Sequence, residues 1–202
     1  MAQKGGGGGR RRRQAKQQQF EELDKYPVLP PHAFARIVRD LRTLNIVYQV
    51  IEPPLTKKEE EVRAEIQTIF IQALTADIEE IDSNPELYLR AAMDQIVKSY
   101  RLKVNKKSRS KIFYYLKRDL IGYGRMDVLM NDANVEDVSL DGTNIPIFAY
   151  HRKFESTETT IAWPTDQELE SFVIKLAQRC GKHISVAEPL LDATLMDGSR
   201  IV

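Results

Sequence analysis

The sequence contains one cysteine, Cys180, and three scattered histidines among its 202 residues. A single cysteine excludes an internal disulfide and any cysteine-rich metal site, and the histidines (His32, His151 and His183) do not have the spacing of metal ligands. No apolar run approaches the roughly 20 residues needed to span a bilayer, and no apolar segment follows the basic N-terminus as in a secretion signal. These absences predict a cytoplasmic protein without a metal centre.

The sequence also lacks the motifs of common catalytic sites. A phosphate-binding loop needs G-x-x-x-x-G-K-[ST], because its glycines let backbone N–H groups approach the phosphates and its lysine neutralises them. Gly181 and Lys182 form a Gly-Lys pair, but His183 replaces the hydroxyl residue, and the pair ends a predicted helix instead of starting one. G-x-S-x-G, H-E-x-x-H and a catalytic Cys/His signature are missing as well. We therefore expect no enzymatic activity from this chain alone.

Charge is distributed unevenly, although the formal net charge is only +1. Residues 4–16 hold six basic residues and no acidic one, including Arg10, Arg11, Arg12 and Arg13. Residues 52–86 hold ten acidic and three basic residues. Residues 98–118 have no acid and nine basic residues, which are Lys98, Arg101, Lys103, Lys106, Lys107, Arg109, Lys111, Lys117 and Arg118. Such a run often marks a solvated helix face, but nine unbalanced charges favour an acidic partner.

Composition and pattern divide the chain into four parts. Residues 1–19 form a Gly/Arg-rich arm that we expect to be disordered, because five consecutive glycines carry high backbone entropy and no side chain to bury. Residues 20–55 are interpreted as a transitional segment with one short strand, since prolines interrupt regular structure there. Residues 56–121 are predicted to form a three-helix bundle, and residues 122–202 a small α+β domain.

Capping signals place the helices. Thr56 and Glu59 have the spacing of a capping box, Pro85 suits the first turn of a second helix, and a third helix should begin near Ser108. Residues 135–140, 145–152 and 159–163 are predicted strands, and Thr165 caps a helix that Gly181 ends. The predicted fold class is α+β, with an N-terminal helical bundle followed by a small antiparallel-sheet-plus-helix domain.

Two segments of this last domain resemble the N-terminal domain of secretion-superfamily ATPases. They are GYGRMDVLMNDANVEDVSLDGTNIPIFAYHR and LAQRCGKHISVAEPLLDATLMDGSRI, which together cover about residues 121–201. The order, the spacing and a dozen or more matched positions carry the resemblance, and it is strongest to the archaeal-type ATPases of archaellum and type IV pilus assembly or type II-like secretion. Met196 departs from the family pattern, which usually has proline there.

The resemblance implies that the chain is part of a longer protein. In that family the D-G-S-R strand leads into the rest of the N-terminal domain, and a linker then joins a RecA-like motor domain that carries the phosphate-binding loop. The resemblance thus implies a truncated chain, whose full-length parent is a hexameric ATP hydrolase that uses ATP and Mg²⁺ bound mainly by the absent domain.

The resemblance also suggests residues for the nucleotide cleft, where arginines of the N-terminal domain reach toward the phosphates. Arg200 is the first candidate, and Arg179 and Lys182 are weaker ones. For each, a structural alternative remains open: Arg200 could pair with Asp192 or Asp197 across the turn, and cations in the last turn of a helix are favoured by its dipole anyway. Four residues are expected to shape the loop, namely Pro189, Asp192, Asp197 and Gly198.

The partners implied are the protein's own motor domain, neighbouring protomers and a membrane platform protein at the inner face of the cell membrane, with anionic lipid as a further contact for the basic segments. Tyrosines interleaved with the basic run could stack on bases, but aromatics at helical spacing more often pack in a core, which disfavours nucleic acid. Two alternatives remain open: a non-enzymatic basic-armed module that binds nucleic acid or an acidic partner, and a scaffold that forms rings without ATP.

Overall fold

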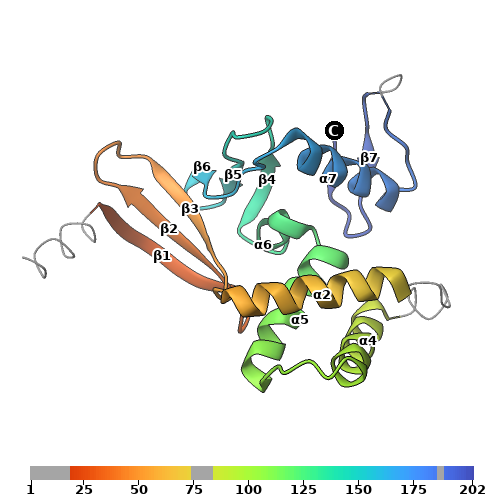
Figure 1. Ribbon diagram of the computed structural model, residues 1–202. Coiled ribbons are helices and arrows are strands. Elements are labelled where there is room, and N and C mark those ends of the chain that lie inside the picture. Colours follow the sequence, from red (N-terminus) through yellow and green to blue (C-terminus); the bar gives the residue numbers. More distant parts are fainter. Residues whose placement is uncertain (1–18, 74–83, 186–188) are drawn as a thin grey trace, which may run out of the picture.

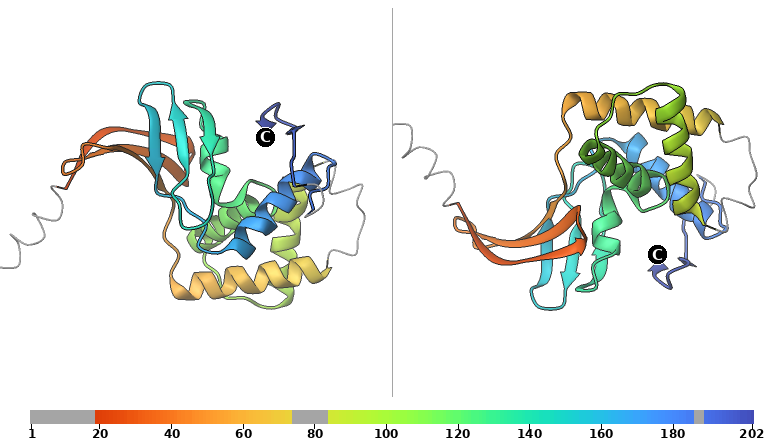
Figure 2. Two further views of the ribbon diagram at one scale, coloured as in Figure 1. Left: turned by 90° about the horizontal axis from the view of Figure 1, so that it is seen from above. Right: turned by 90° about the horizontal axis from the view of Figure 1, so that it is seen from below.

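The computed structural model describes residues 19–73, 84–185 and 189–202 and has an α+β fold (Figure 1). Three parts are visible in Figures 1 and 2: a sheet, a helical bundle beside one end of it, and a C-terminal helix with a short hairpin. The predicted fold class is therefore confirmed. The basic arm, with Arg10, Arg11, Arg12 and Arg13, lies outside the described residues.

The sheet has six strands in the order β1-β2-β3-β6-β5-β4. Neighbouring strands are antiparallel except β3 and β6, which run parallel where Val47 faces Glu158 and Tyr48 faces Thr159. The sheet is therefore made of two antiparallel meanders joined along their edges. Its strands are β1 (Phe20–Leu29), β2 (Ala33–Asp40), β3 (Ile46–Ile51), β4 (Val135–Ser139), β5 (Phe148–His151) and β6 (Glu155–Thr159).

The interpretation of residues 20–55 as a transitional segment with one short strand is wrong. These residues form three strands, and β2 is a central, largely buried strand. Pro27 lies within β1, which is tolerated because β1 is at the edge of the sheet and needs hydrogen-bonding partners on one side only. The sheet consequently begins before the helical bundle in the sequence, and the bundle is an insertion between its two meanders.

The helical bundle follows the predicted order. It consists of α2 (Lys57–Ala73), α4 (Pro85–Ser99) and α5 (Lys106–Leu120). The capping box is confirmed, since Thr56 N–H donates to Glu59 Oε2 at 2.8 Å and Glu59 N–H donates to Thr56 Oγ1 at 3.3 Å. The third helix starts slightly earlier than Ser108, because the side chain of Asn105 accepts the Ser108 N–H and caps it. The bundle core contains Ile66, Leu89, Met93, Ile96, Ile112, Phe113 and Leu116.

The remaining elements follow the bundle in sequence. They are η1 (Gly124–Met126), α6 (Asp127–Met130), α7 (Asp166–Arg179) and the two-stranded hairpin of β7 (Ala193–Thr194) and β8 (Arg200–Ile201). The hairpin lies beside α7, away from the six-stranded sheet (Figures 1 and 2). Thr165 caps α7 and Gly181 has the left-handed φ of +65°, both as predicted. The strand expected at residues 159–163 lies earlier in the chain, because a tight turn follows His151 and β6 then begins at Glu155. Ile161 and Trp163 come after this strand and are buried in the core.

A buried polar cluster joins the two halves of the sheet. Tyr26 and Tyr48 both donate their hydroxyl hydrogens to Asp132 Oδ2, each at 2.6 Å, and Tyr26 Oη lies 3.0 Å from His151 Nε2. Since His151 Nδ1 accepts the Lys153 N–H, the proton of the neutral ring belongs on Nε2, which donates to Tyr26. Burial lowers the pKa of His151, which keeps the ring neutral. This cluster is called the tyrosine–aspartate cluster below.

None of the helices in the described part of the chain is both long enough and apolar enough to span a bilayer.

Candidate functional site

The C-terminal hairpin has the shape that the D-G-S-R pattern predicts. Gly198 adopts a φ of +90°, a region that side chains other than glycine's rarely tolerate, and Asp197 Oδ1 accepts the Ser199 N–H at 2.9 Å. Leu195 N–H donates to the Ser199 carbonyl at 2.8 Å and closes the turn. The loop-shaping role expected of Asp197 and Gly198 agrees with this geometry.

Arg200 lies on this hairpin and is paired with Asp192. Its Nη2 and Nε donate to the two carboxylate oxygens at 2.7 and 3.1 Å, so the guanidinium is held in a two-pronged contact. The hydrogen bonds from Arg200 lower the pKa of Asp192. Both side chains are more than half exposed, at 69% and 63%, and an ion pair so accessible to water contributes little to stability. The structure thus shows the pairing that was one of the alternatives for Arg200.

The geometry of the Arg200–Asp192 pair also shows whether a phosphate would fit against Arg200. A carboxylate with two oxygens on one guanidinium presents the same fork-to-fork geometry that a phosphate group presents. Because Asp192 is exposed, a phosphate could replace it without opening the core. Pro189 and Lys182 are exposed on the same C-terminal part of the chain, and the described residues show no ion pair for Lys182.

Tyr123 connects the two segments that carry the family resemblance. Its hydroxyl donates to Asp197 Oδ2 at 2.8 Å, and the guanidinium of Arg179 lies over its ring at 5.3 Å from the centroid. Arg179 Nη2 also donates to the carbonyl of Ile121. Arg179 therefore fastens the end of α7 to the start of the G-Y-G segment, which leaves it less available to a nucleotide than Arg200.

The G-Y-G-x-x-D pattern has a geometric reason. A Cβ atom on Gly122 would collide with the carboxylate of Asp127, and Gly124 has a φ of +57°. The same carboxylate accepts the Tyr123 N–H at 2.9 Å. Burial raises the pKa of Asp127, and this effect outweighs the hydrogen bond from Tyr123, which lowers the pKa. The pattern therefore fixes the position of Tyr123, and through it the position of the hairpin.

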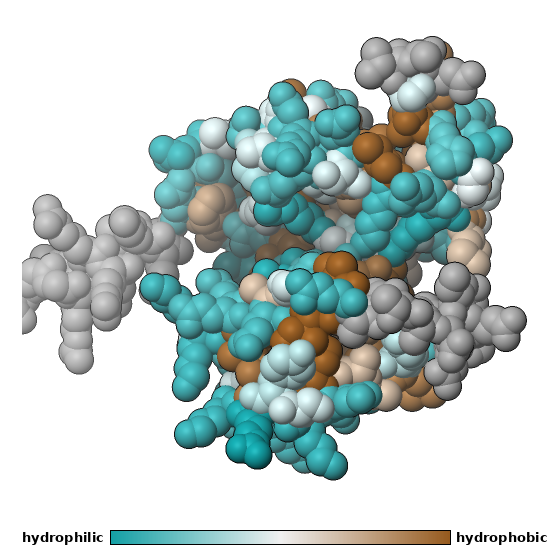
Figure 3. Space-filling model, turned by 45° about the vertical axis from the view of Figure 1, so that its right-hand side comes forward, coloured by the Kyte–Doolittle hydropathy of each residue, from teal (hydrophilic) through white to brown (hydrophobic). Residues whose placement is uncertain are grey.

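Exposed apolar side chains surround the hairpin. Leu190, Met196 and Val202 are 92%, 96% and 92% exposed. Figure 3 shows brown, hydrophobic surface below the grey atoms at the upper right. Such a concentration of exposed apolar residues at one place is typical of a surface that contacts another domain or protein.

The nine basic residues of residues 98–118, called the basic run, do not form one uniform positive patch. Four of its nine residues form ion pairs with acids elsewhere in the chain: Arg118 with Glu52, Lys111 with Glu59, Lys117 with Glu86, and Arg109 with Asp94. Three of these acids belong to the acidic stretch that precedes the run in sequence. The acidic stretch and the basic run, which are separate in sequence, therefore partly neutralise each other in the folded chain. Five basic residues form no ion pair with another described residue, namely Lys98, Arg101, Lys103, Lys106 and Lys107.

Two of these ion pairs are structural. Arg118 Nη1 donates to both oxygens of Glu52 at 2.9 and 2.8 Å, and Tyr114 donates to the same carboxylate at 2.6 Å. Burial disfavours the charged guanidinium, but Asp119 and Glu52 outweigh it and raise the pKa of Arg118. Lys111 similarly lowers the pKa of Glu59 to about 2, with help from the Thr56 backbone. Sequence reasoning missed these roles because the partners are far apart in sequence.

The described residues contain no group of three or more His, Cys, Asp or Glu side chains arranged to hold a metal ion.

The chain is similar in sequence to uncharacterized proteins of one archaeon. No protein-family model matches it. It is 43% identical over 155 residues to the uncharacterized protein MJ1288 of Methanocaldococcus jannaschii, an alignment that covers 76% of this chain and 62% of that protein. Two further proteins of the same organism, MJ0900 and MJ0781, are both 37% identical, over 101 and 90 residues.

The aligned regions are a small part of the latter two relatives. They cover 50% of this chain but 18% of the uncharacterized protein MJ0900, and 44% of this chain but 12% of the uncharacterized protein MJ0781. The chain therefore spans less than two thirds of the length of each of these relatives.

Proposed function

We propose that this chain is the N-terminal regulatory and oligomer-contact part of a hexameric ATPase that drives pilus or archaellum-like filament assembly or protein secretion. One observation carries the proposal. The two segments that resemble such ATPases meet at Tyr123, which binds Asp197 of the hairpin and lies under Arg179 at the end of α7. Segments that belong to one ancestral domain are expected to be packed together in this way.

In the proposed mechanism Arg200 completes the nucleotide cleft of a RecA-like motor domain. A guanidinium offers permanent charge and a rigid fork of donors to phosphate oxygens whose charge develops in the transition state. In the absence of nucleotide, Asp192 holds Arg200 in an exposed position. When the motor domain presents a phosphate, Arg200 exchanges Asp192 for it, and the chain moves as a rigid body against the motor.

Two further observations support this arrangement. Leu190, Met196 and Val202 are apolar and almost fully exposed beside Arg200, as expected for the surface that a motor domain or a neighbouring protomer covers. The chain also aligns with a small part of two longer archaeal proteins, as expected for a domain that is joined to others.

We expect the assembly to be cytoplasmic and peripheral at the inner face of the membrane, where unpaired basic residues meet a membrane platform protein. Each basic residue near an anionic surface adds about 1 kcal/mol of attraction.

The proposal predicts ATP hydrolysis by the complete gene product, alone or together with an ATPase that copurifies with it. Purified material should hydrolyse ATP only with Mg²⁺, and mass photometry should show a six-subunit ring whose population rises with nucleotide. The chain by itself should not hydrolyse ATP, since its sequence has no phosphate-binding loop.

Rings that form equally without nucleotide and never hydrolyse ATP would instead indicate a scaffold. A monomeric complete product without ATPase activity, which binds nucleic acid with a steep salt dependence, would favour the basic-armed binding module.

A further inference from the structure

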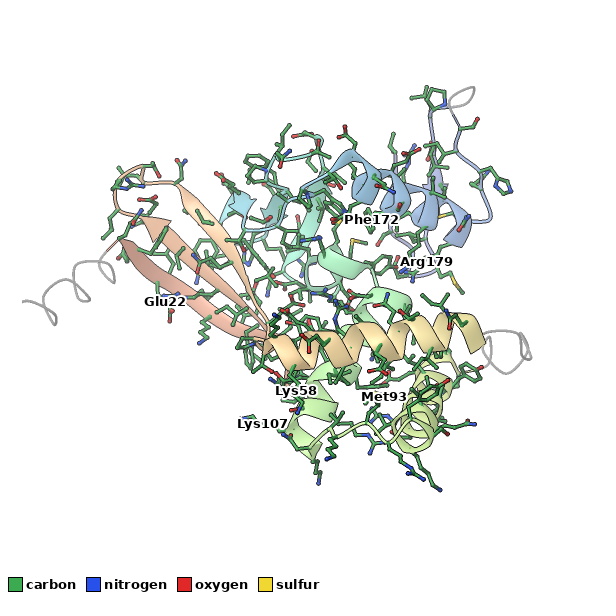
Figure 4. The ribbon with its side chains drawn as sticks, in the orientation of Figure 1. Glu22, Lys58, Met93, Lys107, Phe172 and Arg179 are labelled. Atoms are coloured by element: carbon green, nitrogen blue, oxygen red, sulfur yellow. The ribbon has the colours of Figure 1, made fainter. Side chains whose placement is uncertain are left out.

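A cleft of about 430 Å³ lies between the starts of α2 and α5 and is lined by four lysines. Lys58 comes from the first turn of α2, Lys103 from the loop before α5, and Lys107 and Lys111 from α5 itself. Figure 4 shows the labelled Lys58 and Lys107 at neighbouring ends of the two helices. We call this feature the basic cleft. The C-terminal hairpin lies away from it in both Figures 1 and 2, so it is separate from the site around Arg200.

One lysine of the basic cleft is neutralised and fixed. Lys111 Nζ donates to Glu59 Oε2 at 2.6 Å and to the carbonyl of Pro54 at 3.0 Å, and both charged side chains are largely buried. Lys58, Lys103 and Lys107 are exposed and form no ion pair with another described residue. The basic cleft consequently has three positive charges that no described acid pairs with, and the Lys111–Glu59 ion pair forms part of its wall.

The position of these charges is unfavourable for the helices. The first turn of a helix carries a partial positive charge, which stabilises anions and destabilises cations. The first turn of α5 holds Lys106 and Lys107 and has no acidic residue. The first turn of α2 begins with Lys57 and Lys58, although Glu59 and Glu60 follow. Local stability alone would select the opposite charge at the start of α5, and such a conflict is expected at functional sites.

A bound anion would remove the conflict. It would neutralise the three lysines and the ends of both helices together, and unpaired N–H groups in the first turn of a helix also donate to anions. The volume of the cleft lies within the range that holds small molecules. Lysine is a common point-charge partner of phosphate, whose three oxygens can accept from several ammonium groups at different angles. A single carboxylate of an acidic peptide would satisfy fewer of them.

We propose that the basic cleft binds the phosphate groups of a phosphorylated ligand, either a free mono- or diphosphate compound or the headgroup of an anionic lipid. Lys58, Lys103 and Lys107 contact the phosphate oxygens, and Lys111 with Glu59 forms the fixed wall. This site goes beyond the role of Arg200 and does not depend on ATP hydrolysis.

Titration calorimetry with sodium pyrophosphate and co-sedimentation with vesicles test the proposal. The vesicles contain phosphatidylcholine with or without phosphatidylglycerol. Lys103→Ala and Lys107→Ala should each weaken binding about tenfold, the loss expected for one charge-assisted hydrogen bond. Lys98→Ala is the matched control, because Lys98 is an exposed lysine of the same basic run outside the cleft, and it should bind like the unmodified protein.

A second variant separates binding from folding. Lys107→Glu places an acid in the first turn of α5, so it should raise the Tm of the protein while it abolishes binding. Pyrophosphate or anionic vesicles should raise the Tm of the unmodified protein and leave that of Lys107→Glu unchanged. Saturable binding of pyrophosphate identifies a free phosphate ligand, and binding to anionic vesicles alone identifies a lipid headgroup. Absence of both, or an equal loss in Lys98→Ala, would overturn the proposal.

Discussion

Replacing Asp132 by leucine should lower the free energy of unfolding by about 3–5 kcal/mol, because two buried hydroxyl groups lose their acceptor together. Tyr26 and Tyr48 both donate to Asp132 Oδ2, Tyr48 is fully buried, and Asp132 is 5% exposed. The tyrosine–aspartate cluster connects β1 and β3 to the loop before β4, so its loss should loosen the joined meanders. Urea denaturation followed by circular dichroism measures the change.

Asp137→Leu is the matched control for this prediction. Asp137 is exposed on β4, and its hydrogen bond is to the neighbouring Val138 N–H, so its replacement should change stability by less than about 0.5 kcal/mol. Adding Tyr26→Phe and Tyr48→Phe to Asp132→Leu should restore part of the loss, since the unsatisfied hydroxyls are then removed. A triple variant no more stable than Asp132→Leu would show that the cost has another cause.

If the proposed function holds, Arg200→Ala in the complete protein should reduce kcat for ATP hydrolysis by about 10³-fold, the lower end of the effect of an arginine that stabilises the transition state of phosphoryl transfer. Nucleotide affinity should change far less, because the proposed contact strengthens as charge develops on the phosphate. The stability of the chain should be nearly unaffected, since the Arg200–Asp192 pair is exposed. Steady-state kinetics together with binding of a fluorescent ATP analogue measure the two effects separately.

Arg152→Ala is the matched control for Arg200→Ala. Arg152 is 63% exposed and forms a comparable surface ion pair with Glu136 at 2.9 Å. It lies on the β4–β5 side of the sheet, away from the hairpin, and its loss should leave kcat unchanged. Equal losses of kcat and affinity in Arg200→Ala, or an equal effect of Arg152→Ala, would contradict a role in the transition state.

Local signals predicted the helices well. The capping box of Thr56 and Glu59, the cap of Thr165 and the left-handed Gly181 depend on residues within four positions of each other, so the sequence contains the whole interaction. The helix α5 begins at Lys106, earlier than the predicted start near Ser108, because Asn105 supplies the capping side chain.

The N-terminal strands could not be predicted in the same way. The assignment of β1 depends on its edge position, which makes Pro27 acceptable there, and the place of β3 in the sheet depends on pairing with β6 more than 100 residues later. The acceptor of Tyr48 is also distant in sequence, because Asp132 lies 84 residues further along the chain. Neither contact leaves a local pattern that periodicity or turn residues could reveal.

The candidate site was predicted in part. The D-G-S-R turn was identified from its residues, whereas the Arg200–Asp192 pair remained one of two alternatives until the structure showed it. The basic run was interpreted as nine unbalanced charges, yet Glu52, Glu59 and Glu86 neutralise three of them across the bundle. Of the five residues of the run that form no ion pair with another described residue, Lys103 and Lys107 line the basic cleft, which no sequence motif marks.

Hydrogen exchange of the complete protein, with and without a non-hydrolysable ATP analogue and Mg²⁺, tests most directly whether the C-terminal hairpin faces a nucleotide. Peptides that contain residues 193–201 should exchange more slowly when the analogue is bound, and peptides from β4 and β5 should not change. Unchanged exchange in the hairpin under conditions in which the analogue is bound would contradict the account.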